Sequence, residues 1–290
     1  MMRSRLERAL SPLIGLLLVL QAGIVVTGGA VRLTGSGLGC PTWPECTHGS
    51  IAPVPHQAQG VFHSWIEFGN RLLTFALIAA SIAVIVAIVR LKRKDIRTLG
   101  IWQLLGIIAQ IPLGGITVLT HLNPIPVAGH FLLSIALIAA GTTLFERRHI
   151  NAVTSRAIEM KNFLLARIHI ILSALVIIVG TVVTGSGPNA GDISAPRFNI
   201  SIDRVAWLHA GLVIALMVVT VALFFSCNDS LLRKRIKIFI VAALAQGAIG
   251  FAQYYQGLPE LLVGMHLLGV TLVWISAWRI HLAAQIGKLR

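Results

Sequence analysis

The sequence predicts an all-α, polytopic membrane protein with eight transmembrane helices arranged as two pseudo-symmetric four-helix bundles. Three observations lead to this prediction. The composition is apolar, with 56% hydrophobic and 12% charged residues and a mean hydropathy of +0.84, whereas soluble domains carry about 25% charged residues. Eight apolar runs are long enough to cross a bilayer, and a set of short motifs occurs twice along the chain.

The eight runs leave few residues for a soluble domain. A helix needs ~20 apolar residues to cross the hydrocarbon core of a bilayer. The runs are 11–31, 68–89, 99–119, 127–145, 163–183, 205–225, 238–255 and 261–280. The first run follows a basic start, as a signal peptide does, but it is about 20 residues long and no small-residue cleavage site follows it. We therefore expect a retained helix.

The net charge of +14 indicates orientation rather than a nucleic-acid partner. With a cytoplasmic N-terminus, 20 of the 24 basic residues fall in segments on the cytoplasmic side. Those on the outer side are Arg32, Arg71, Arg197 and Arg204. This distribution follows the positive-inside rule. The sequence thus predicts a protein of the plasma membrane, in contact with lipid and not with nucleic acid, with both termini in the cytoplasm.

An internal repeat divides the chain into two halves. The motif Leu33-Thr-Gly-Ser-Gly37 returns as Val183-Thr-Gly-Ser-Gly187, and Gln110-Ile-Pro-Leu-Gly114 is echoed by Gln246-Gly-Ala-Ile-Gly250. In the second pair of motifs a histidine follows the glutamine after 20 residues, as His130 and His266. An even number of helices in each half gives parallel repeats. We expect an N-terminal half at 1–146, a cytoplasmic linker at 147–162 and a C-terminal half at 163–290.

Polar side chains recur at one depth in alternate helices. The second, fourth, sixth and eighth runs enter the membrane from the outer side. Near the start of these runs lie Glu67 with Asn70, His130, His209 and His266. At a rise of 1.5 Å per residue, these side chains are within ~10 Å of the outer interface. Side chains on facing helices build the cofactor sites of bundles. His209 and His266 therefore suggest two axial ligands for the iron of a resident haem b. The alternative is that each histidine only forms an interhelical hydrogen bond.

The first half differs at the matching position. Opposite His130 stands Asn70, whose neutral amide is a poor iron ligand, and Glu67 lies one helical turn before it. An ionisable group inside a membrane is functional by default, although an ion pair of Glu67 with Arg71 at i+4 is the alternative. His63 would share this face one turn further back, and Arg71 is a candidate partner for a haem propionate. One strong ligand with a nearby acid indicates a reactive site.

The cysteines and remaining histidines suggest simpler roles. Cys40 and Cys46 lie together in the first outer loop, where an oxidising environment favours a disulfide; a metal site with His48 is the alternative. Cys227 is expected to be an inert thiol at the inner membrane edge. The remaining histidines expected on the inner side, either solvated or at the interface, are His149, His169 and His281.

Several motifs together resemble the haem A synthase family of bacterial and mitochondrial membranes, over nearly the whole chain. They are Gly28-Gly-Ala-Val-Arg-Leu-Thr-Gly-Ser-Gly-Leu-Gly-Cys-Pro-Thr-Trp-Pro-Glu-Cys46, Trp65-Ile-Glu-Phe-Gly-Asn-Arg71, Gln110-Ile-Pro-Leu-Gly-Gly-Ile-Thr-Val118, Thr184-Gly-Ser-Gly-Pro188 and Gly264-Met-His266. The resemblance implies an oxidoreductase that acts on a methyl group, converting the C8 methyl of haem O to the formyl of haem A by successive hydroxylations and loss of water.

The resemblance also implies roles for residues and partners. His209 and His266 would ligate haem b, His130 would serve the substrate haem O, Glu67 would be essential to catalysis, and Cys40 with Cys46 would be a redox-active or stabilising pair. A haem O synthase and an electron-transfer partner would work with the protein, and the sequence leaves a homo-oligomer open.

One departure from the family pattern stands out. The family has Glu-x-x-His-Arg in the second helix, and this chain has Glu67-Phe-Gly-Asn70-Arg71. Either His63 replaces the missing ligand, or the substrate haem is five-coordinate on His130. Two other functions compete. A di-haem cytochrome b-type electron carrier would need two complete histidine pairs, and a transporter with parallel repeats would more often place its polar site at the midplane.

Overall fold

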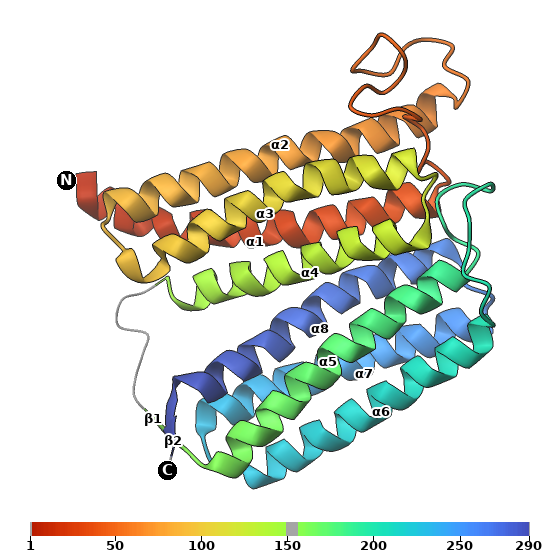
Figure 1. Ribbon diagram of the computed structural model, residues 1–290. Coiled ribbons are helices and arrows are strands. Elements are labelled where there is room, and N and C mark those ends of the chain that lie inside the picture. Colours follow the sequence, from red (N-terminus) through yellow and green to blue (C-terminus); the bar gives the residue numbers. More distant parts are fainter. Residues whose placement is uncertain (1, 149–155, 290) are drawn as a thin grey trace. The chain divides into compact units, whose positions relative to one another are not determined.

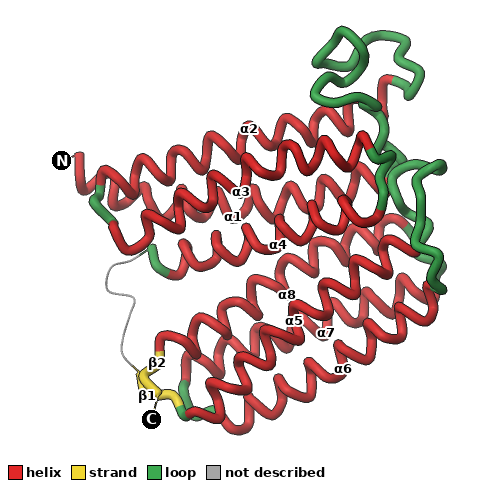
Figure 2. Tube along the Cα trace, viewed as in Figure 1, coloured by secondary structure: helices red, strands yellow, loops and turns green. Residues whose placement is uncertain are grey.

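A computed structural model describes residues 2–148 and 156–289, and about three quarters of them are helical (Figure 1; Figure 2). The helices are α1 Met2–Leu33, α2 Val61–Arg90, α3 Lys94–Leu119, α4 Pro124–Glu146, α5 Met160–Ser186, α6 Ile202–Ser226, α7 Ser230–Tyr255 and α8 Glu260–Ile286. Two short strands, β1 Arg156–Ile158 and β2 Gly287–Leu289, pair in parallel. Within these two described ranges, eight helices are long and apolar enough to cross a membrane, which confirms the predicted eight-helix membrane protein.

The helices extend beyond the apolar runs that predict them. The clearest case is α2, which begins at Val61 rather than near Phe68. An apolar window stops at the first polar residues, whereas backbone hydrogen bonding continues through them to the end of the helix. His63, Glu67 and Asn70 therefore lie on one continuous helix, at intervals of one turn.

Specific side chains set the ends of two helices. Asn123 precedes Pro124, and its side-chain oxygen accepts a hydrogen bond from the backbone N–H of Ile125, 3.0 Å away. Asp229 caps α7 in the same way, with Oδ1 2.7 Å from the backbone nitrogen of Leu232. Both caps satisfy N–H groups that the first helical turn leaves free. Proline fits the first position of α4 because its missing N–H would have no partner there.

The chain divides into two compact units. Over the described residues, unit 1 comprises Met1–Arg148 and Thr184–Asn199, and unit 2 comprises His149–Val183 and Ile200–Arg290. The loop that follows α5 therefore packs with the first four helices. The predicted linker at 147–162 includes residues 149–155, among them His149, which lie outside the described part of the chain.

Unit 1 is a closed four-helix bundle. Helix α1 packs along α2 and α4, and α3 packs along the same two helices (Figure 1). Helices α2 and α4 therefore lie diagonally across the bundle. In unit 2, α7 packs along both α6 and α8, whereas α5 has no comparably extended backbone contact with a described helix.

The buried apolar core lies toward one end of each unit. We call the end at which odd-numbered helices finish and even-numbered helices begin the outer end, and the opposite end the inner end. In unit 1 the core comprises Leu10, Ile14, Leu17, Leu77, Ala80, Val84, Ala87, Ile88, Leu91, Ile96, Ile107, Leu137 and Leu144. Apart from Leu91, which follows the inner end of α2, and Ile107 at the middle of α3, all of these residues belong to the inner half of their helices. Dense side-chain packing therefore holds the inner half of this bundle together.

The same asymmetry occurs in unit 2. Its fully buried apolar side chains include Leu223, Leu232, Ile236, Phe239, Ala277 and Ile280, and each lies in the inner half of its helix. The predicted ligand-type residues Asn70, His130, His209 and His266 all lie in the outer halves. The outer half of each unit thus holds the side chains that are able to bind a ligand or take part in chemistry, and these side chains lie beyond the main apolar core.

Candidate functional site

Each of the four even-numbered helices places one ligand-type side chain against a glycine of the preceding helix. A Cβ added at Gly114, Gly180 or Gly250 would lie 3.4, 3.2 and 3.2 Å from Cε1 of His130, His209 and His266, respectively. A Cβ at Gly28 would lie 3.9 Å from Nδ2 of Asn70. The four positions that the repeat aligns in sequence are therefore equivalent in structure as well.

The glycines determine how the imidazoles face. At Gly180 and Gly250 the ring atoms within 4 Å of the glycine position are Cε1 and Nδ1, and Nε2 is not among them. Nδ1 of His130 and His266 is buried without a hydrogen-bond partner among the described residues. Because the rings of His209 and His266 contact the neighbouring helix through the Cε1–Nδ1 edge, Nε2 of each ring is turned away from that helix and is the nitrogen left to bind a ligand.

At two of these positions, a glutamine from the preceding helix donates a hydrogen bond to the backbone of the histidine. Nε2 of Gln246 donates to the carbonyl oxygen of His266 at 2.9 Å. Nε2 of Gln110 donates to the carbonyl oxygen of His130 at 3.1 Å and to Oγ of Ser134 at 2.7 Å. The same interhelical bond thus joins α3 to α4 and α7 to α8, and fixes the depth of the histidine on its helix.

Glu67 is buried and engaged on both carboxylate oxygens. Glu67 is only 6% exposed to solvent. Oε2 accepts a hydrogen bond from the backbone N–H of Cys40 at 2.7 Å, and Oε1 lies 2.6 Å from Nη2 of Arg71. The i,i+4 ion pair with Arg71 that the sequence left open is therefore present.

Arg71 also fastens the first outer loop to α2. Its Nη2 donates to the carbonyl oxygens of Cys40 and Thr42 at 2.9 and 3.2 Å, and its Nη1 to that of Glu45 at 3.2 Å. A planar guanidinium suits several acceptors at once. The propionate contact expected from the sequence stays a prediction, because the guanidinium faces loop carbonyls here.

The predicted Cys40–Cys46 disulfide is present, and both cysteines are fully buried. Nε2 of Gln57 and Oγ of Ser64 both donate to the carbonyl oxygen of Gly39, at 2.6 and 2.9 Å. These bonds bury the start of the disulfide loop against α2. Among the described residues no group of three or more His, Cys, Asp or Glu side chains forms a metal cluster.

The second glycine of the Gly114-Gly115 pair serves the same loop. A Cβ at Gly115 would lie 2.5 Å from the ring of Trp43, so Trp43 packs directly on the backbone of α3. Neighbouring glycines thus receive two different rings, His130 from α4 and Trp43 from the loop. Sequence reasoning missed both contacts. A signal was present, because in each half a glycine lies 16 residues before the histidine of the next helix, as Gly114 and Gly250.

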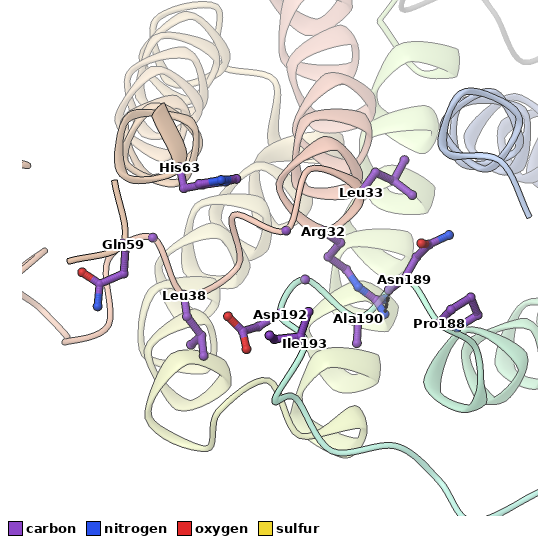
Figure 3. Close-up of a pocket in the computed structure, with 13 residues that line it drawn as sticks. Arg32, Leu33, Leu38, Gln59, His63, Pro188, Asn189, Ala190, Asp192 and Ile193 are labelled. Atoms are coloured by element: carbon purple, nitrogen blue, oxygen red, sulfur yellow. Dashed lines mark hydrogen bonds between the residues drawn. The ribbon is translucent and has the colours of Figure 1, made fainter. Parts of the chain in front are cut away.

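His63 lies further out than Asn70 and faces a separate cavity. Its Nδ1 is 2.9 Å from Oγ of Ser36. It lines a cavity of about 390 Å³ together with Arg32, Asn189 and Asp192. Figure 3 shows these side chains around the cavity, contributed by α2, the end of α1 and the loop at 184–199. The hydrogen bond from Nη2 of Arg32 to the carbonyl oxygen of Asn189, at 2.9 Å, joins α1 to that loop.

The remaining histidines divide by exposure. His48, His56 and His121 are exposed and His281 is partly buried. The expectation of a solvated or interfacial His169 is wrong: it is fully buried, both ring nitrogens lack a partner among the described residues, and its ring meets Phe239 edge-on at 4.5 Å. An apolar helix face can enclose a lone imidazole, and hydropathy does not reveal which face turns inward.

Cys227 fits its predicted role at the inner edge. The residue is 2% exposed, and burial raises the pKa of its thiol. A thiol with a raised pKa carries less of the nucleophilic thiolate at neutral pH. Cys227 is therefore expected to be unreactive.

Comparison with known proteins agrees with the motifs. Residues 12–196, more than half of the chain, match the family model COX15-CtaA, described as cytochrome oxidase assembly protein. The chain belongs to this family. The match covers the first four helices, the disulfide loop, α5 and most of the loop after α5.

Relatives with curated names point in the same direction. The chain is 35% identical over 103 residues to a protein named heme A synthase from Geobacillus kaustophilus (strain HTA426), covering 34% of this chain and 30% of the relative. It is 33% identical over 138 residues to one from Lysinibacillus sphaericus (strain C3-41), covering 46% and 41%. It is 27% identical over 186 residues to one from Shewanella oneidensis (strain MR-1), covering 60% and 54%. The chain thus spans about a third to half of the length of these relatives.

Proposed function

We propose that the protein is a haem A synthase, an oxidoreductase that converts the C8 methyl of haem O to a formyl group by successive hydroxylations. The observation that carries the proposal is the set of matched positions in the outer halves, where three imidazoles and one amide each lean on a glycine of the preceding helix. Family membership and the curated names of its relatives support it.

In this proposal unit 2 holds a resident haem b. His209 and His266 supply two imidazoles, the ligand set of six-coordinate electron-transfer haems. The donor set fits, because Gly180 and Gly250 leave room for both rings and Nε2 of each is turned away from the supporting glycine. Such a haem accepts and passes on single electrons. Gln246 keeps His266 at its depth by bonding to its carbonyl oxygen.

Unit 1 is the proposed substrate side, with one imidazole, His130, for the iron of haem O. Gly114 supports the ring and Gln110 fixes its depth. Glu67 lies one turn from Asn70 on α2, and its carboxylate is held between the Arg71 guanidinium and the Cys40 amide. A carboxylate in this position can accept protons released as the methyl group is oxidised. Arg71 and the disulfide loop position this carboxylate.

The proposal includes a cellular setting. Basic residues concentrate in the segments at the inner ends of the helices, so we place both termini in the cytoplasm and the protein in the plasma membrane. Each hydroxylation removes two electrons from the methyl carbon, which calls for an electron-transfer partner. A haem O synthase would deliver the substrate.

The deciding experiment is haem extraction from the purified full-length protein after co-expression with a haem O synthase. We expect haem b together with haem O, its hydroxylated form and haem A. Haem b alone, with no haem A formed, would contradict the proposal and favour the di-haem cytochrome b-type electron carrier.

Glu67→Gln tests the catalytic side separately. We expect haem A production to fall by about 10²-fold or more, the usual contribution of a general acid–base group, while the haem b spectrum stays unchanged. Glu260→Gln is a matched control, because Glu260 is an exposed carboxylate in the first turn of α8. Unchanged haem A production in Glu67→Gln would remove this residue from the mechanism.

A further inference from the structure

Asn70 occupies the one position of the four where the chain has an amide in place of an imidazole. Oγ1 of Thr27 has two acceptors within reach, Oδ1 of Asn70 at 2.7 Å and the carbonyl oxygen of Ile24 at 3.3 Å, and the shorter contact assigns its one proton to Asn70. The amide oxygen is therefore tied to α1. The amide nitrogen, 3.9 Å from the Cβ position at Gly28, donates no hydrogen bond to the described part of the chain. Asn70 is thus oriented with both N–H donors unused.

Asn70 and His130 lie at the same depth on diagonal helices. Their depth can be measured from a buried layer of polar side chains nearer the inner end. In this layer Nε2 of Gln21 donates to Oε1 of Gln103, and Nε2 of Gln103 donates to the carbonyl oxygen of Leu137. Asn70 meets α1 at Thr27 and Gly28, six and seven residues outward from Gln21. His130 is seven residues outward from Leu137. Both positions are therefore about 10 Å above the layer, at a rise of 1.5 Å per residue.

His63 is not in a position to replace the missing ligand. It lies seven residues from Asn70 on α2, about 10 Å further along the helix axis. Its Nδ1 is engaged with Ser36, and its ring lines the outer cavity beside Arg32 (Figure 3). The side chains at the depth of His130 that could serve a haem iron are therefore the imidazole from α4 and the amide of Asn70 from α2.

We propose that unit 1 gives the iron of its haem substrate one protein ligand, His130, and that the Asn70 amide donates a hydrogen bond to a small ligand on the opposite face of the iron. The inference rests on the proposed function. It makes Asn70 a hydrogen-bond donor on the side of the iron opposite His130, rather than a residue that merely stands where a second iron ligand has been lost. The occupant it selects is a small anion or water with a free acceptor lone pair, because the amide nitrogen offers two unused N–H donors.

The test uses the full-length ferric protein, purified after co-expression with a haem O synthase, with fluoride as the probe ligand. We expect two haems per chain with different spin states, low-spin in unit 2 with its two imidazoles and high-spin in unit 1. Fluoride should bind the high-spin haem alone. Asn70→Ala should weaken fluoride binding about tenfold, the size of one hydrogen bond to a charged acceptor.

Asn70→His supplies the complementary variant. The imidazole should convert the high-spin signal to a second low-spin signal and abolish fluoride binding. The low-spin signal of unit 2 reports in every variant that the protein has folded. Two low-spin haems in the unsubstituted protein, or unchanged fluoride affinity in Asn70→Ala, would overturn the inference alone. One haem per chain, with no haem A in the extract, would overturn the proposed function and this inference with it.

Discussion

Glycine has a specific use at the histidine positions of this protein. Gly180 and Gly250 each stand where a Cβ would lie 3.2 Å from a histidine ring, a separation at which the neighbouring atom must give way. Their value is therefore steric rather than conformational, since both lie inside regular helices. The absence of a side chain on α5 and α7 decides the orientation of the imidazoles on α6 and α8.

Replacing Gly250 by valine should therefore displace His266 and weaken haem b binding. Overpacking of this kind typically costs about 1–3 kcal/mol, which corresponds to a loss of affinity of about tenfold or more. Gly247→Val is the matched control, because nothing lies within 4 Å of a Cβ at Gly247 on the same helix. Haem b content per protein and the low-spin spectrum provide the measurement. Equal haem content in the two variants would show that the glycine contact does not set the ligand.

At the scale of the helices, unit 1 is joined across its centre by hydrogen-bonded side chains. Gln21 on α1 and Gln103 on α3 are 3% and 0% exposed, and Gln103 reaches on to the carbonyl oxygen of Leu137 on α4. A Cβ at Gly141 would clash with Oε1 of Gln21. The glutamine layer thus joins three helices where the apolar core meets the outer half.

Gln103→Leu should lower the free energy of unfolding by about 1–2 kcal/mol, because it leaves the buried Gln21 amide without its partner. The double variant Gln21→Leu/Gln103→Leu should cost less than the sum of the single variants, since both polar groups are then removed. Detergent-induced unfolding followed by circular dichroism measures all three. Strict additivity would mean that the two glutamines do not interact in the membrane.

At the scale of the whole molecule, one sequence pattern is used twice, and the set of ligand-type side chains differs between the two copies. The bond from a glutamine to a histidine carbonyl recurs in both units, and so does the glycine contact, whereas Asn70 breaks the ligand set in unit 1. The two units therefore share the glutamine and glycine contacts but differ in the side chains that could bind iron. This division agrees with the proposal that one unit keeps its haem and the other acts on a passing one.

The proposed orientation of the molecule can be checked with fusions. A green fluorescent protein joined after Arg290 should fluoresce, and alkaline phosphatase inserted at Gly49 in the disulfide loop should be active, since the two sites fall on opposite sides of the membrane. The physical reason is the concentration of lysine and arginine in the segments at the inner ends. An active phosphatase at the C-terminus would reverse the assignment.

The sequence predicted much of the fold because a membrane imposes helix length and apolarity directly. It also predicted the disulfide, since two cysteines stood close together in one loop. It did not predict the burial of His169 or the bond from Thr27 to Asn70, because both depend on how a helix rotates about its axis. Nor did it show that the loop at 184–199 packs with the first four helices, since chain order alone places that loop in the second half.

The position of the apolar core also bears on the order of biosynthesis. Side chains such as Leu17, Ile88 and Leu144 in unit 1, and Ile236 and Ile280 in unit 2, are buried in the inner halves, away from the outer positions of the histidines. The helices of each unit can therefore associate in the bilayer as soon as they are inserted. Under the proposed function, haem loading would then be a late step on an assembled scaffold, and a cell short of haem would accumulate inserted apoprotein rather than unfolded chains.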